Sequence, residues 1–208
     1  FAGLDVKGKV VVHLSGSPSN VPGALSAHSQ SAAERWSTLK RLGAIGTISI
    51  ANPKSMDVPW ERSSPNRLNP AMALGDAALD DTAGQQVSIA FNPAKAERLF
   101  QGSGHTFAEM LKIADEGKAL PRFALPSSVR ATVAVENMGV ESHNVAGIVR
   151  GSDPKMAGEF VVLTAHLDHV GVGAPINGDD IYNGAMDNAS GIASLLEILG
   201  RKGYLRDA

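Results

Sequence analysis

One apolar segment that ends in ligand-type side chains most constrains what this chain can fold into. Residues 161–165 read Val-Val-Leu-Thr-Ala, and His166 and Asp168 follow at once. A loop with several Gly, Asn and Asp residues comes next, and Asp187 then precedes an apolar stretch with helical periodicity. An α/β sheet usually presents its ligand-binding residues at the carboxyl ends of its strands. This order therefore predicts an α/β domain with a metal site at one edge of its sheet.

The composition permits a sizeable core and excludes several classes of function. The chain has 208 residues, 43% of them hydrophobic, which allows one large domain or two small ones. Its 19 basic and 21 acidic residues form no long runs, so we expect no nucleic-acid partner. No apolar segment approaches the roughly 20 residues that a membrane helix needs, and we expect no membrane partner. There are no cysteines, which excludes disulfides and thiolate zinc ligands.

The first part of the chain, residues 1–126, predicts a small α+β domain. Ser31 with Glu34, and Thr106 with Glu109, have the S/T-x-x-E spacing of a helix capping box. Residues 51–80 read mostly as loop. Apolar runs and caps predict strands over 9–14, 44–50 and 86–91, and helices over 31–42, 93–100 and 106–117.

The pattern changes after residue 126. Residues 129–136 alternate with a period of two, as a half-buried strand does, and we expect further strands over 144–150 and 159–165. Residues 189–199 predict an apolar helix. Residues 127–208 are therefore interpreted as a second domain.

The side chains at the proposed sheet edge suit metal binding. His166 and Asp168 point to the same side of a strand, because they are two residues apart. A metal-bound imidazole normally donates its other N–H to a carboxylate, and the Asp168 side chain is close enough in sequence to accept it. Asp187 would lie in front of a helix N-terminus, where its carboxylate could bridge two cations. The alternative is that His166 and Asp168 only cap the end of a strand through hydrogen bonds.

These motifs resemble a known family. VVLTAHLDHVG followed by NGAMDNASGIASLLEI is similar to the co-catalytic di-zinc exopeptidases, which include bacterial leucyl aminopeptidases and glutamate carboxypeptidase. Residues 141–154 match the approach to the same strand. The resemblance implies that His166 binds one zinc, that Asp187 bridges two zinc ions, and that Asp168 is the supporting catalytic carboxylate. Residues 5–12 and 42–48 resemble the protease-associated domain that some members carry, whereas residues 51–120 match only loosely.

The sequence departs from that family at its end. In the family, the general-base Glu, its neighbouring Glu ligand, a further acidic ligand and a final His all follow the bridging Asp, and this sequence ends before any of them. We therefore expect residues 127–208 to be the truncated N-terminal part of a zinc peptidase domain, with the remainder of that domain as its partner. For this chain alone we expect weak or no zinc binding and no turnover. Glu197, in the apolar helix, is interpreted as a helix residue and not as the base.

Other candidate sites are weaker. His169 lies three residues after His166, but H-x-x-H zinc pairs usually lie on a helix, so a cleft-lining or structural role is favoured. Asp179 and Asp180 lack the calcium-binding pattern of an EF-hand and read as turn residues. No G-x-S-x-G nucleophile elbow is present, which makes a serine hydrolase remote.

The sequence is best interpreted as part of a secreted or periplasmic di-zinc exopeptidase that acts on peptides, with an aminopeptidase favoured over a carboxypeptidase. The competing hypothesis is a non-catalytic protein-interaction module, as in receptor-like relatives with an unused metal motif. Intact His166, Asp168 and Asp187 favour the enzyme. The oligomeric state cannot be predicted from these patterns.

Overall fold

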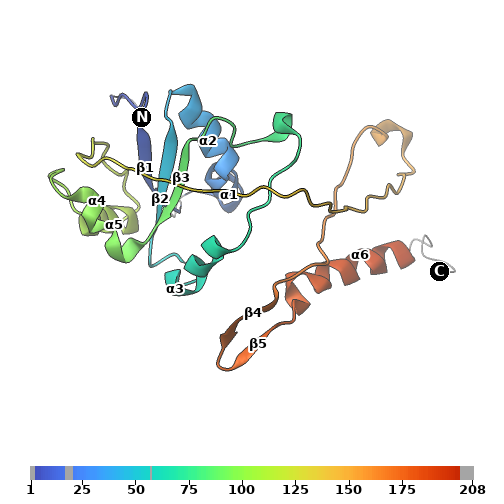
Figure 1. The fold of residues 1–208 in the computed structure, drawn as a ribbon. Coiled ribbons are helices and arrows are strands. Elements are labelled where there is room, and N and C mark those ends of the chain that lie inside the picture. Colours follow the sequence, from blue (N-terminus) through green and yellow to red (C-terminus); the bar gives the residue numbers. More distant parts are fainter. Residues whose placement is uncertain (1–2, 17–20, 57, 202–208) are drawn as a thin grey trace. The chain divides into compact units, whose positions relative to one another are not determined.

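The structure is a computed structural model that describes residues 3–16, 21–56 and 58–201 (Figure 1). It divides into two compact units, Phe1–Val140 and Glu141–Ala208. The division lies C-terminal to residue 126, where the sequence pattern changes. Both units combine helices with strands, parallel in the first and antiparallel in the second. The chain therefore has the mixed α/β fold that the sequence predicts.

The first unit is built on a three-stranded parallel sheet in the order β1-β2-β3. Its strands are β1 (Val10–Ser15), β2 (Gly46–Ala51) and β3 (Val87–Phe91). All three strands predicted for this part of the chain are thus confirmed, with ends that differ by one or two residues.

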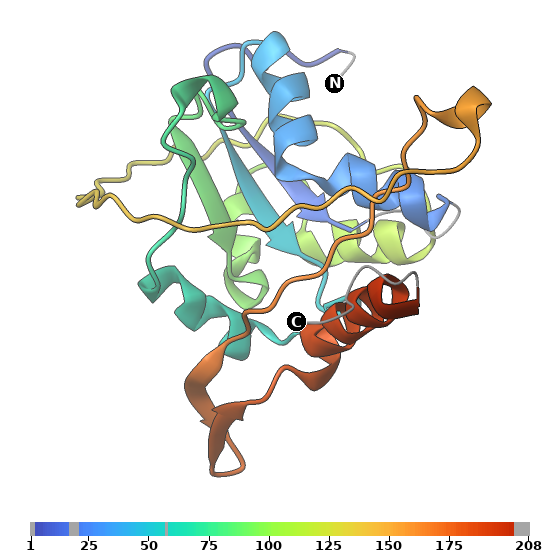
Figure 2. The same cartoon turned by 90° about the vertical axis from the view of Figure 1, so that its right-hand side faces the viewer.

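Helices cover both faces of this sheet (Figures 1 and 2). The longer ones are α1 (Gly23–Gln30), α2 (Ala32–Arg41) and α5 (Phe107–Asp115), and α3 (Trp60–Ser63) and α4 (Glu97–Phe100) are single turns. Short 3₁₀ segments occupy Ser64–Leu68, Ala77–Leu79 and Pro93–Lys95. The predicted helices correspond to α2, α4 with its preceding 3₁₀ turn, and α5. The sequence did not predict α1, which starts after Pro22 without a side-chain cap.

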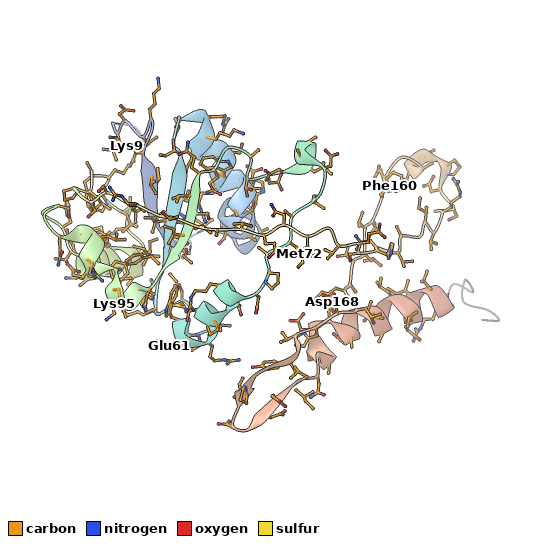
Figure 3. All side chains as sticks on the ribbon, viewed as in Figure 1. Lys9, Glu61, Met72, Lys95, Phe160 and Asp168 are labelled. Atoms are coloured by element: carbon orange, nitrogen blue, oxygen red, sulfur yellow. The ribbon has the colours of Figure 1, made fainter. Side chains whose placement is uncertain are left out.

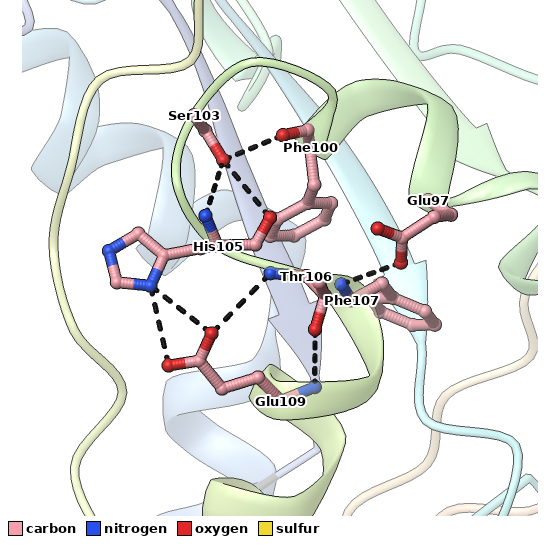
Figure 4. A network of polar contacts seen from close by, with 7 residues as sticks. All are labelled: Glu97, Phe100, Ser103, His105, Thr106, Phe107 and Glu109. Carbon is pink, nitrogen blue, oxygen red and sulfur yellow. Dashed lines mark hydrogen bonds and ion pairs between the residues drawn. The ribbon is translucent and has the colours of Figure 1, made fainter.

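The start of α5 shows why local sequence signals succeed here (Figure 4). Thr106 Oγ1 accepts a hydrogen bond from Glu109 N at 3.1 Å, and Glu109 Oε2 accepts one from Thr106 N at 3.4 Å. Glu97 Oε2 accepts a third from Phe107 N at 2.9 Å. Because the first N–H groups of a helix have no partner within it, these three hydrogen bonds stabilise its N-terminus.

The core of the first unit consists of two apolar clusters on opposite faces of the sheet. Alternate residues of a strand face opposite ways, so Val11 packs in one cluster while Val12 and Leu14 pack against the other. The first cluster, on the α2 side, consists of Val6, Val11, Trp36, Leu39 and Ala44. The second, on the side of α4 and α5, is built around Ile50, Ala96, Phe100, Phe107 and Met110. Burial on both faces is what a parallel sheet requires.

The sheet face under α2 also carries polar side chains, and they have partners. Thr47 is buried, and its Oγ1 accepts a hydrogen bond from Gln85 Nε2 at 2.9 Å. Trp36 Nε1 donates to the Ala83 carbonyl at 3.2 Å. Among the described residues, no buried side-chain nitrogen or oxygen atom lacks a hydrogen-bond partner.

His13 on β1 makes the stability of the first unit depend on pH. Burial of its ring, and then the positive charge of Arg35, lower the pKa of His13 from 6.5 to about 4. The folded chain thus favours neutral His13, while the unfolded chain binds a proton below pH 6.5. Stability is complete above pH 6.5 and falls as the pH drops toward 4, by on the order of 2–3 kcal/mol.

Urea unfolding at pH 7 and pH 4.5 checks this expectation. The His13→Gln variant should lose less stability between the two pH values than the wild type does, because glutamine does not titrate. Carboxylate titrations occur in both proteins and cancel in the comparison. Equal losses in the two proteins would show that His13 is not responsible.

The second unit is built on a β-hairpin followed by a helix. The strands β4 (Gly171–Ile176) and β5 (Asp179–Tyr182) pair antiparallel. Asn177 and Gly178 connect them with φ values of 52° and 88°, and Asn-Gly is the dipeptide that two-residue hairpin turns prefer. A turn at Ala185–Ala189, in which the backbone angles of Asp187 and Asn188 are not helical, leads into α6 (Ser190–Arg201), which confirms the helix predicted over 189–199. A 3₁₀ turn lies at Pro154–Met156.

The strands predicted over 129–136, 144–150 and 159–165 are wrong for this structure, which has no strand between residues 118 and 170. A strand needs a neighbour to hydrogen-bond, and none pairs with these segments among the described residues. Their apolar side chains are exposed: Val145 is fully exposed, and Phe160, 74% exposed, is labelled in Figure 3. Alternation of apolar and polar residues indicates that a segment could form a strand, but the strand forms only if another strand pairs with it.

The described helices include none that is both long enough and apolar enough to cross a membrane.

Candidate metal centre

The hairpin of the second unit brings the proposed ligands together. His166 and Asp168 lie in an extended segment just before β4, and Asp187 lies in the turn between β5 and α6. Because β4 and β5 run antiparallel, the chain returns after β5 to the point where β4 began. The turn at Asp187 therefore meets the segment that carries His166.

His166 lies between two acidic residues. Its Nε2 atom is 3.0 Å from Asp187 Oδ1, and its Nδ1 atom is 2.9 Å from the backbone carbonyl oxygen of Asp168. The Asp168 carboxylate is farther from Nδ1, at 3.5 Å, and its side chain is 93% exposed. Asp168 thus orients the imidazole mainly through its carbonyl, which accepts a hydrogen bond from the Nδ1–H group and directs Nε2 toward Asp187.

These contacts raise the pKa of His166 above its usual value of 6.5. The hydrogen bond to the Asp168 carbonyl is the largest cause, and the negative charges of Asp187 and Asp168 add to it. A metal ion binds only the neutral imidazole, so a proton and a cation compete for the Nε2 position. Metal affinity should accordingly increase as the pH rises through the pKa of His166.

Gly191, near the start of α6, and Ala165, next to His166, are small enough to let these two segments lie close together. Asn188 Oδ1 accepts a hydrogen bond from Gly191 N at 2.9 Å, so Asn188 caps α6. A Cβ atom on Gly191 would lie 3.0 Å from Ala165 Cβ and closer still to the Asn188 side chain. The peptide bond between Asp187 and Asn188 is cis.

A second imidazole also lies at this carboxylate. His169 Nδ1 is 3.9 Å from Asp187 Oδ2, and the His169 side chain is 25% exposed, half the exposure of His166 at 50%. The sequence favours a cleft-lining or structural role for His169. The proximity of His169 to Asp187 depends on how the hairpin returns the chain, and no sequence motif indicates it.

The donors fit zinc in type but are few in number. Imidazole nitrogen and carboxylate oxygen are both zinc ligands in proteins. His166 provides an imidazole nitrogen and Asp187 a carboxylate oxygen. These two atoms are 3.0 Å apart, which is close enough for both to bind one metal ion. Within the described ranges, however, no group of three or more His, Cys, Asp or Glu residues is arranged to hold a metal ion. The described residues therefore form a partial site with two convergent donors.

Comparison with known proteins supports a peptidase relationship for this segment. Residues 144–201 match the family model described as Peptidase family M28, whose members are zinc-dependent. The match lies within the second unit and includes His166, Asp168 and Asp187. No curated protein and no solved structure matches the chain significantly. The match supports a hydrolase of the metallopeptidase class, related to the zinc exopeptidases.

Proposed function

We propose that the chain is part of a zinc-dependent exopeptidase, with an aminopeptidase favoured over a carboxypeptidase, that hydrolyses peptide substrates. Residues 1–126 would be a protease-associated domain, and residues 127–208 would belong to a peptidase domain. One observation carries the proposal: His166 Nε2 and Asp187 Oδ1 converge to 3.0 Å inside the segment that matches Peptidase family M28.

Each residue of the site has a proposed role. His166 would hold a zinc ion through Nε2, and the Asp187 carboxylate would be the ligand shared by two zinc ions. Asp168 keeps the imidazole in the orientation and tautomer that leave Nε2 available, since its carbonyl accepts from Nδ1 at 2.9 Å. When bound, zinc supplies a Lewis acid that polarises the scissile carbonyl and makes water more acidic.

We expect this chain alone to bind zinc weakly and to hydrolyse no substrate. A catalytic zinc usually has three protein ligands, and the described residues bring two donors together. An assay with aminoacyl-nitroanilides, with zinc added and with a chelator added, should detect no metal-dependent release of nitroaniline. Hydrolysis that the chelator abolishes would contradict this expectation.

Binding of an amino-acid hydroxamate tests the proposed function without requiring turnover. The zinc-loaded chain should bind leucine hydroxamate in calorimetry, and the His166→Ala variant should not, because the hydroxamate binds through the metal. N-acetyl-leucine hydroxamate is the matched probe: weaker binding would favour an aminopeptidase, which recognises the free amine. Binding that is the same with and without zinc would contradict the proposal and favour a non-catalytic interaction module.

A further inference from the structure

We propose that His169 is a positioning residue, whose imidazole holds the turn at Ala185–Ala189 so that the Asp187 carboxylate faces His166. This inference rests on the proposed metal site, because it assigns to His169 the orientation of one of that site's ligands. The zinc-binding motif assigns no role to His169.

Each oxygen of the Asp187 carboxylate lies near an imidazole. Two imidazoles approach different oxygens of Asp187: His166 Nε2 is 3.0 Å from Oδ1, and His169 Nδ1 is 3.9 Å from Oδ2. Asp187 is itself 72% exposed, so few contacts restrict its side chain. With one imidazole at each oxygen, rotation of the carboxylate away from His166 would give up both contacts.

His169 also packs against Gly184, the residue that precedes the turn. Gly184 has a φ of 66°, and a Cβ atom there would lie 2.7 Å from both Cβ and Cγ of His169. The ring of His169 therefore rests directly on the backbone of Gly184. The Gly184 carbonyl in turn accepts a hydrogen bond from Ala189 N at 3.2 Å, which closes the turn around Asp187. His169 thus packs against the residue that precedes the turn and lies near the ligand within it.

The His169 nitrogen approaches the carboxylate less closely than the His166 nitrogen does. A separation of 3.9 Å is too long for a direct hydrogen bond. The Nδ1 atom of His169 lies beside the second oxygen of Asp187, whereas Nε2 of His166 lies beside the first. Removing a residue that supports a metal ligand typically lowers metal affinity by about 10–100-fold.

Three substitutions separate the polar role of His169 from its bulk. In His169→Asn, the side-chain amide can take the place of Nδ1. In His169→Phe, a ring remains but no nitrogen. In His169→Ala, both are lost. Zinc affinity of the full chain, measured by competition with a chromophoric chelator, should fall by roughly 10-fold for alanine and for phenylalanine. It should recover in large part for asparagine. His143→Ala, at an exposed histidine of the same unit, is the control and should bind zinc like the wild type.

A measurement on the metal-free chain separates this inference from the proposed function. Nuclear Overhauser effects between the His166 ring protons and the Asp187 β-protons should be present in the wild type and in His169→Asn. They should be lost in His169→Ala. If the wild type shows them but binds no zinc, the proposed function fails while the positioning role stands. Wild-type behaviour of His169→Ala in both measurements, or full recovery by phenylalanine, would overturn the inference.

Discussion

The Asp187→Ala substitution is expected to weaken zinc binding by the chain by roughly 100-fold or more. Asp187 provides the carboxylate 3.0 Å from His166 Nε2, and alanine would leave a single imidazole donor. Loss of a residue that only supports a ligand already lowers metal affinity by about 10–100-fold, so loss of a ligand should cost at least as much. Competition with a chromophoric zinc chelator at pH 7.5 measures the change.

Two further variants make this test specific. Asp180→Ala removes an exposed carboxylate from β5 in the same unit, and zinc affinity should not change. Asp187→Asn retains an oxygen ligand without the negative charge, and its affinity should fall between those of the wild type and Asp187→Ala. If Asp187→Ala binds zinc as tightly as Asp180→Ala, Asp187 is not a ligand.

The Leu39→Ala substitution is expected to lower the free energy of unfolding of the first unit by about 3 kcal/mol. Leu39 is 1% exposed in the cluster on the α2 side of the sheet, where it packs with Trp36 and Val11. Truncation of a buried leucine leaves a cavity and typically costs about 2–5 kcal/mol. Both tryptophans, Trp36 and Trp60, belong to the first unit, so tryptophan fluorescence during urea unfolding reports on this unit alone.

A matched leucine provides the control. Leu25 on α1 is 62% exposed, and Leu25→Ala should change the free energy of unfolding by less than about 0.5 kcal/mol. A Leu39→Ala variant that unfolds at the same urea concentration as Leu25→Ala would show that the cluster under α2 is not packed as described.

The fold of the first unit could be predicted because its signals are local. Ser31 Oγ does accept a hydrogen bond from Glu34 N, at 3.1 Å, and Thr106 forms a complete capping box. The three strands read as short segments rich in β-branched and other apolar residues. The hairpin β4-β5 was missed even though Asn177 and Gly178 form a strong turn signal, because the residues around them do not alternate clearly between apolar and polar.

The second unit shows where such predictions fail. Strands over 129–136, 144–150 and 159–165 were inferred from side-chain patterns alone, and whether a strand forms also depends on a partner elsewhere in the chain. The proximity of His166 and Asp187 was expected from the motifs and the family resemblance, and the structure brings the two side chains together. The contact of His166 with the Asp168 carbonyl and the position of His169 depend on backbone geometry that a motif does not describe.

The central claim, that His166 and Asp187 share one metal ion, is tested most directly by crystals of the chain soaked in zinc. Diffraction data collected at the zinc absorption edge should show an anomalous peak about 2.0–2.2 Å from both His166 Nε2 and an Asp187 carboxylate oxygen. A peak only elsewhere, such as at His105 and Glu109, whose Nδ1 and Oε2 atoms are 3.3 Å apart, would contradict the account. So would the absence of any peak beside His166 at saturating zinc.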